Sequence, residues 1–130
     1  MANTAEITAG QVASTKANDD DVQAFGVFMV TEHSGAQLQL KGLADSLRLP
    51  APDSLDAEHV ALKMQFDSLS GRSFDSVYIH SQVKDHQTTI ALFEKEISKG
   101  RNGSLIDFAN NQMPHLQKHL QTADSLAQKF

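Results

Sequence analysis

Apolar residues recur every three or four positions in several segments of the chain, a spacing that predicts amphipathic α-helices. The clearest stripe alternates steps of four and three residues and consists of Ile79, Val83, His86, Ile90, Phe93 and Ile97. His86 stands where an aliphatic side chain is expected. A buried histidine needs polar partners, because an unpaired buried polar group costs about 1–3 kcal/mol. The stripe therefore predicts a helix with a polar point inside its packing face.

The same periodicity predicts four further helices. They are expected over residues 4–17, 20–47, 55–70 and 104 to about 128. Asp19 or Asp20 is expected to cap the second helix, Ser73 the helix that carries His86, and Ser104 the last helix. In the second helix the predicted stripe includes Glu32.

Turns and connectors group these helices into pairs. Residues 4–48 and 72–128 are expected to form two helical hairpins, and the Pro-containing crossover 49–71 joins them. A chain of 130 residues suits one domain, here residues 1–130. We therefore predict an all-α fold: a four-helix bundle with an additional short crossover helix.

Composition and charge exclude several classes of function. The net charge is −5 and the basic residues are scattered, which argues against nucleic acid as a partner. The absence of cysteine excludes disulfides and thiolate metal sites. No apolar run approaches the roughly 20 residues of a transmembrane helix. Motifs for nucleophilic catalysis, phosphate loops and dinucleotide binding are missing, so no catalytic residue is predicted and the sequence favours a protein that is not an enzyme.

Helix geometry places four polar residues at one height. With a rise of about 1.5 Å per residue, Glu6 and His33 lie roughly 18–21 Å from the turn near Asp19. His86 and His119 lie roughly 20–25 Å from the turn at 99–103, each on its own helix. All four side chains are therefore expected to reach the middle of the bundle.

Two interpretations of these polar residues at the middle of the bundle remain open. Inward-facing imidazoles and carboxylates, with Glu32 and Asp85 nearby, could hold a divalent metal such as zinc or iron. Alternatively they form a buried hydrogen-bond network in which Asp85, Gln82 and Tyr78 satisfy the imidazoles. The Glu-x-x-His motifs of di-iron bundles do not occur, which counts against a ferritin-type redox enzyme.

The remaining histidines are expected to be structural or exposed. His115 is four residues before His119 and could share a zinc ion with it, but Pro114 disturbs that turn and a solvent-facing His115 is expected. His59 lies near the start of the crossover helix and is expected to lie far from the middle of the bundle.

Four segments of the chain resemble a known family. The first three are AEITAGQVASTKANDDDVQAFGVFMVTEH, DAEHVALKMQFDSLSG and FDSVYIHSQVKDHQTTIALFEKE. The fourth is LIDFANNQMPHLQKHLQTADSL. Together they are similar to the exported bacterial proteins grouped as the ferritin-like "domain of unknown function 4142". The resemblance covers nearly the whole chain, and its most specific parts are the Asp-His-Gln and Pro-x-x-x-x-His segments.

This resemblance implies a ferritin-like bundle in the periplasm or cell envelope, reached by a signal peptide that the present sequence does not contain. It implies no established reaction. The polar positions that recur in the family correspond here to Glu6, His33, Asp85, His86 and His119. One departure is the segment 31–33, Thr-Glu-His, where the family usually has an acidic residue followed by Asp-His.

The sequence thus leads to two hypotheses. In the first, an exported ferritin-like protein holds a divalent metal such as zinc or iron, through Glu6, His33, Asp85, His86 and His119, or a small ligand, at the middle of the bundle. In the second, the protein is a structural or stress-related interaction protein whose buried polar residues serve only the fold. Neither hypothesis involves nucleic acid or a transmembrane segment, and both are compatible with a homodimer.

Overall fold

The computed structural model describes residues 2–130, and these form five α-helices without any strand. The helices are α1 (Ala2–Lys16), α2 (Asp20–Ser46), α3 (Ala57–Ser68), α4 (Gly71–Lys99) and α5 (Gly103–Ala127). The predicted all-α class is confirmed. None of these helices is long and apolar enough to cross a membrane.

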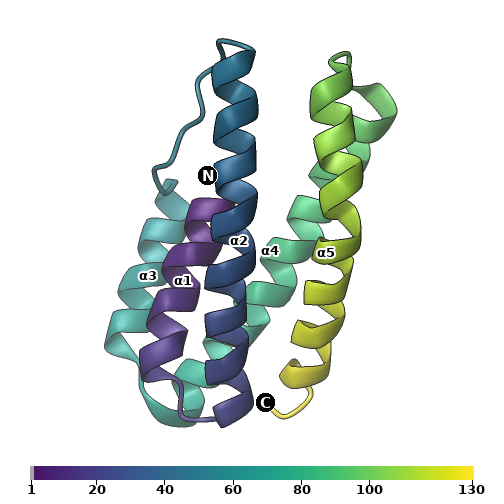
Figure 1. Cartoon of the computed structure of the whole chain (residues 1–130). Coiled ribbons are helices and arrows are strands. Elements are labelled where there is room, and N and C mark those ends of the chain that lie inside the picture. Colours follow the sequence, from purple (N-terminus) through teal and green to yellow (C-terminus); the bar gives the residue numbers. More distant parts are fainter. Residues whose placement is uncertain (1) are drawn as a thin grey trace.

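The helices pack chiefly in two pairs, α1 with α2 and α4 with α5 (Figure 1). The shorter α3 lies beside α1 on the outside of the bundle, and the N-terminus of α1 lies about halfway up the molecule (Figure 1). The upper parts of α2, α4 and α5 therefore extend beyond α1. This difference in helix length matters for the cavity described below.

The first pair is held together by a close approach of two backbones. A Cβ added at Gly26 would lie 2.8 Å from the Cβ of Ala13 and 3.0 Å from the carbonyl oxygen of Gly10. A Cβ at Gly10 would lie 2.8 Å from the carbonyl oxygen of Gly26. Each glycine thus leaves room for the opposite helix.

We expect Gly26→Ala to destabilise the protein by about 2 kcal/mol, because the new methyl group must push α1 away from α2. Gly35→Ala is the matched control in the same helix: nothing lies within 4 Å of its added Cβ. That change should stabilise the fold by about 0.5–1 kcal/mol, since alanine favours the helix over glycine. Urea unfolding of both variants measures the difference. Equal effects of the two changes would contradict the close approach.

The apolar core fills the lower half of the bundle. Its largest members are four aromatic rings from three helices, Phe25, Phe66, Phe74 and Tyr78. The rings of Phe74 and Tyr78 are stacked with centroids 5.9 Å apart. Edge-to-face contacts join both rings to Phe66. This core anchors the lower part of α4, on which His86 lies two turns further along.

A buried carboxylate ties the α1–α2 turn to α4. Asp75 is 1% exposed, and its two oxygens accept hydrogen bonds from the backbone N–H groups of Asn18 and Asp19, at 2.9 and 2.8 Å. These two N–H groups lie at the junction of two helices and have no helical partner of their own. Asp75 therefore fixes the first helix pair against the second.

Several predicted helix ends were wrong. Asn102, and not Ser104, caps α5: its side-chain oxygen accepts from the N–H of Leu105 at 3.1 Å. The N-cap of α4 is Ser70, so Ser73 lies inside the helix. The crossover helix is also shorter than predicted, because Asp56 caps it by accepting from the N–H of His59 at 2.9 Å.

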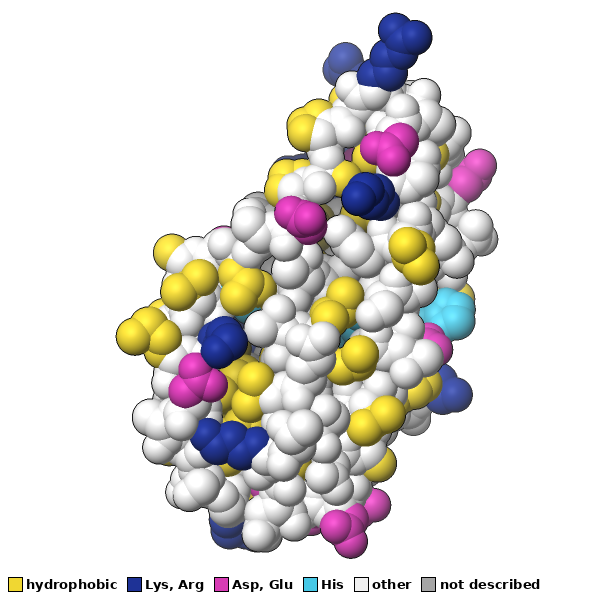
Figure 2. Space-filling model, turned by 60° about the vertical axis from the view of Figure 1, so that its left-hand side comes forward, with side chains coloured by type: hydrophobic (Ala, Val, Ile, Leu, Met, Phe, Trp, Pro, Cys, Tyr) yellow, Lys and Arg dark blue, Asp and Glu magenta, His cyan; other side chains and the backbone are white. Residues whose placement is uncertain are grey.

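Charged side chains are dispersed on the face drawn in Figure 2. Dark-blue and magenta groups alternate with exposed hydrophobic side chains, and no large basic patch is visible there. Among the ion pairs, Lys129 bridges Asp19 and Asp21, and Lys84 pairs with Glu58. On this face the structure thus resembles an ordinary solvated surface.

Candidate metal centre

Three histidine side chains meet inside the bundle. The ring centroids of His33, His86 and His119 lie 5.3 to 5.5 Å from one another, so they form a nearly equilateral triangle. One ring nitrogen of each histidine lies within 4.8 Å of those of the other two. The three residues come from α2, α4 and α5, and each is at most 3% exposed. The predicted convergence of these imidazoles is therefore present.

The position of His33 corrects one detail of the predicted stripe. His33 is buried on the inner face of α2, between Met29 and Ala36, whereas Glu32 is only half-buried. Steps of four and three residues join Met29, His33 and Ala36. Met29 and Ala36 could belong to a stripe that passes through Glu32 or to one that passes through His33. The structure shows that His33 is the residue that faces inward.

Two of the histidines are oriented by acceptors on the outer side of the triangle. The Nδ1–H of His33 donates to the side-chain oxygen of Asn3 at 2.9 Å. Nδ1 of His86 lies 2.8 Å from the backbone carbonyl oxygen of Gln82 and donates to it. Such acceptors fix the tautomer and leave Nε2 as the nitrogen with the lone pair. Asn3 was not predicted, although it lies one turn before Glu6 on α1.

The third histidine has a carboxylate neighbour. Nε2 of His119 lies 3.6 Å from a carboxylate oxygen of Glu32, which is also 3.2 Å from Nδ1 of His115. The His115 side chain is 58% exposed, as predicted. The ring of Phe28 covers His119 edge-on at a centroid distance of 5.3 Å. Glu32 can therefore orient His119 through Nε2, which would leave Nδ1 for a ligand.

The remaining ring nitrogens are buried and bare. Nε2 of His33, Nε2 of His86 and both ring nitrogens of His119 have no hydrogen-bond partner within residues 2–130, although Nε2 of His119 lies near Glu32. An unpaired buried polar atom costs about 1–3 kcal/mol, so three of them at one point need a physical reason. Nitrogen atoms with free lone pairs, converging from three helices, are what a divalent metal requires.

Burial keeps these imidazoles neutral. It lowers the pKa of His33 to about 3, and the neighbouring His86 and His119 lower it further toward that value. Burial also lowers the pKa of His119 to about 4 and shifts the pKa of His86 downward. Metal ligation needs the unprotonated ring, so the site is prepared for an ion at neutral pH and below it.

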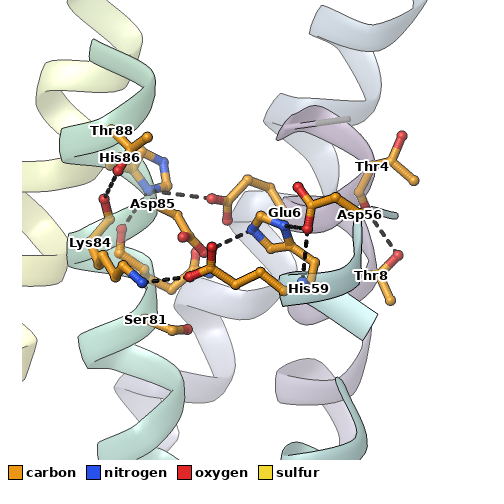
Figure 3. A network of polar contacts seen from close by, with 12 residues as sticks. Thr4, Glu6, Thr8, Asp56, His59, Ser81, Lys84, Asp85, His86 and Thr88 are labelled. Atoms are coloured by element: carbon orange, nitrogen blue, oxygen red, sulfur yellow. Dashed lines mark hydrogen bonds and ion pairs between the residues drawn. The ribbon is translucent and has the colours of Figure 1, made fainter. Parts of the chain in front are cut away.

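Glu6 lies beside the triangle and does not complete it. Its carboxyl group is 3.7 Å from Nδ1 of His86, the nitrogen that faces Gln82, as the dashed line in Figure 3 shows. Burial, reinforced by the negative charge of Asp85, raises the pKa of Glu6 to about 8. A mostly protonated carboxyl group therefore stands next to His86 at neutral pH. From this place it can orient the imidazole.

The structure does not bring Asp85 to the triangle. Its carboxylate faces α3, where it lies 3.5 Å from Nε2 of His59, and Nδ1 of His59 is 2.7 Å from Asp56 (Figure 3). The expectation that His59 would lie far from the middle of the bundle was wrong. Because α3 starts only at Ala57, after an extended connector, its first turn lies at the level of His86.

A metal ion would have to draw the three nitrogens together. In a tetrahedral zinc site with Zn–N distances of about 2.0–2.1 Å, neighbouring nitrogens lie about 3.3 Å apart. The nitrogens here are separated by up to 4.8 Å. Inward motion of each ring by about 1 Å would close the site, a shift that small changes in side-chain torsion can supply.

Comparison with known proteins gives a family and no function. No curated protein and no solved structure matches the chain. A model of the family described as "Domain of unknown function (DUF4142)" matches residues 1–126, nearly the full length and all three histidines. The chain therefore belongs to the DUF4142 family.

Proposed function

We propose that this protein binds one divalent metal ion, zinc in the first place, through His33, His86 and His119. The observation that carries the proposal is the convergence of three buried ring nitrogens that have no partner among the described residues. In a purely architectural network the imidazoles would bond to one another or to nearby polar groups. Here Nδ1 of His33 and Nδ1 of His86 have such partners, and Nε2 of His119 lies near Glu32, whereas one further nitrogen of each ring has none, which favours a ligand at the centre.

The donor set favours zinc over iron. Three neutral imidazoles match the three protein ligands and one open position of many zinc sites. Iron of the ferritin type needs several carboxylates, and non-haem iron oxygenases use two histidines and one carboxylate. Asp85 is turned toward His59. Glu6 lies next to the outer nitrogen of His86, where it suits an orienting role.

The proposal extends to fold type and location. Two packed helix pairs, joined by a segment that contains α3, suit a ferritin-like four-helix bundle with an additional crossover helix, built as one domain of two hairpins. The similarity of four sequence segments to exported proteins supports a place in the periplasm or envelope. In this setting the protein would bind or buffer a metal ion and would need no catalytic residue.

Zinc should raise the melting temperature of protein purified without nickel or chelator. A ligand at 100 times its dissociation constant stabilises the folded state by about 2.7 kcal/mol, provided that it binds only that state. We expect His86→Leu to remove this gain, since one of three ligands is lost. Elemental analysis should find close to one zinc per chain in the wild type and much less in the variant.

His80→Leu is the matched control. It is the same substitution on the same helix, and the His80 side chain is exposed. This variant should keep the zinc-dependent shift in melting temperature. Loss of the shift in both variants, or its persistence in both, would refute binding at the three histidines.

A further inference from the structure

A cavity adjoins the triangle of histidines. It has a volume of about 610 Å³ and lies between the upper parts of α2, α4 and α5. This volume is within the range of about 300–1,000 Å³ that is usual for small-molecule sites. Most of its wall is apolar and includes Ala36, Leu40, Phe93, Leu105, Phe108 and Leu116.

Two of the three histidines belong to the wall of this cavity. His33 and His119 line it, whereas His86 and Glu6 do not. Both lining residues are at least 97% buried, and both have ring nitrogens that lack a partner in the part of the chain described. The side of the triangle formed by His33 and His119 therefore borders a space that could hold a molecule, whereas His86 does not line that space.

We propose that the cavity binds a small carboxylic acid with an apolar body, whose carboxylate takes the open position of the metal ion. This inference rests on the metal site proposed above. Three neutral imidazoles leave the full charge of a divalent ion in a region of low dielectric constant, where an anionic ligand is strongly favoured. The apolar wall would then bury the rest of the molecule.

The wall itself contributes no net charge. Lys95 and Lys99 line the cavity together with Glu32 and Glu96, so that two positive and two negative groups balance. The attraction for an anion would therefore come from the ion and not from the rim. Glu32 is a competing carboxylate, but its oxygen is already shared between His115 and His119.

The test uses cobalt(II), whose visible absorption reports on its ligands, bound to the full chain. Acetate, butanoate, hexanoate and octanoate are added in turn to the cobalt-loaded protein. Affinity should increase about fourfold per added CH₂ until the cavity is filled, which is the gain expected from burying a methylene group. Octanol of the same length should not change the spectrum, because it lacks the carboxylate.

Variants locate the site. Ala109→Phe places a large ring in the cavity wall and should weaken octanoate binding at least tenfold, with little effect on acetate. Ala91→Phe, on the exposed side of α4, should change neither affinity. If Ala109→Phe does not fold, the series of acids of increasing chain length on the wild type still tests whether the cavity binds the apolar part of the acid.

The outcomes separate the two proposals. If cobalt absorption is absent, or is the same in His86→Leu, the metal site fails and the inference fails with it. If cobalt binds at the histidines but all four acids bind equally, only the cavity inference is overturned. Octanoate binding of equal strength with and without cobalt would likewise overturn it.

Discussion

Replacing Glu6 by glutamine should stabilise the metal-free protein by about 3 kcal/mol at pH 7 and leave its stability at pH 4.5 nearly unchanged. Burial raises the pKa of Glu6 from 4.5 to about 8. Between these values the folded protein keeps a proton that the unfolded chain has released. Each pKa unit corresponds to about 1.4 kcal/mol, so the wild type loses stability as the pH rises from 4.5 to 8. Glutamine carries no such proton and escapes this loss.

The histidines act in the opposite direction. Because their folded pKa values lie below 6.5, the unfolded chain binds protons that the folded protein excludes. Below pH 6.5, falling pH therefore removes stability, by roughly 2–3 kcal/mol each for His33 and His119 at pH 4.5. In the wild type the Glu6 contribution offsets part of this loss. We expect maximum stability of the metal-free wild type at about pH 6–7.

Urea unfolding between pH 4.5 and 8, in the presence of a chelator, measures how the free energy of unfolding changes with pH in the wild type and in Glu6→Gln. Glu94→Gln is the matched control, because Glu94 is exposed on α4. Its pH dependence should follow that of the wild type. Parallel curves for Glu6→Gln and the wild type would show that Glu6 is not protonated in the folded protein.

Replacing Asp75 by alanine should destabilise the protein by about 4 kcal/mol. The change leaves the N–H groups of Asn18 and Asp19 without their acceptor in a partly buried turn, where an unpaired group costs up to about 1–3 kcal/mol. The lost side chain also leaves a cavity between the two helix pairs. Denaturant unfolding measures the loss directly.

Two further variants separate hydrogen bonding from other effects. Asp75→Asn keeps one oxygen acceptor but places an amide donor opposite the second N–H group, so about half of the loss is expected. Asp124→Ala, at an exposed position of α5, should change stability by less than about 0.5 kcal/mol. If Asp75→Ala is as mild as Asp124→Ala, the turn does not depend on this carboxylate.

Most of the fold could be predicted from the sequence, because helices follow from periodicity and from strong turn signals. The level of the histidines was predictable for the same reason: the rise per residue is constant, so a count from a turn gives a height. The count succeeded for His33, His86 and His119, which all lie on long helices next to well-marked turns.

The height of a residue could not be predicted where the chain before it is not helical. His59 follows a connector whose extended path cannot be measured in residues, and the structure places it beside Asp85. That contact also explains why the role of Asp85 could not be predicted: its neighbour on α4 points inward, whereas Asp85 faces α3. The role of Asn3 could not be predicted, because a single asparagine near the start of a helix belongs to no recognisable sequence motif.

Because the three histidines lie on three different helices, an ion bound to them would link the first part of the chain to the last. α1 and α2 belong to the first part of the sequence, α4 and α5 to the last, and each pair packs mainly within itself. An ion held by His33 on one side and by His86 and His119 on the other would be a removable cross-link between the two halves. Binding of the ion would suppress motions in which the two helix pairs separate. Amide hydrogen exchange should therefore be slower in α1, α2, α4 and α5 when the ion is bound.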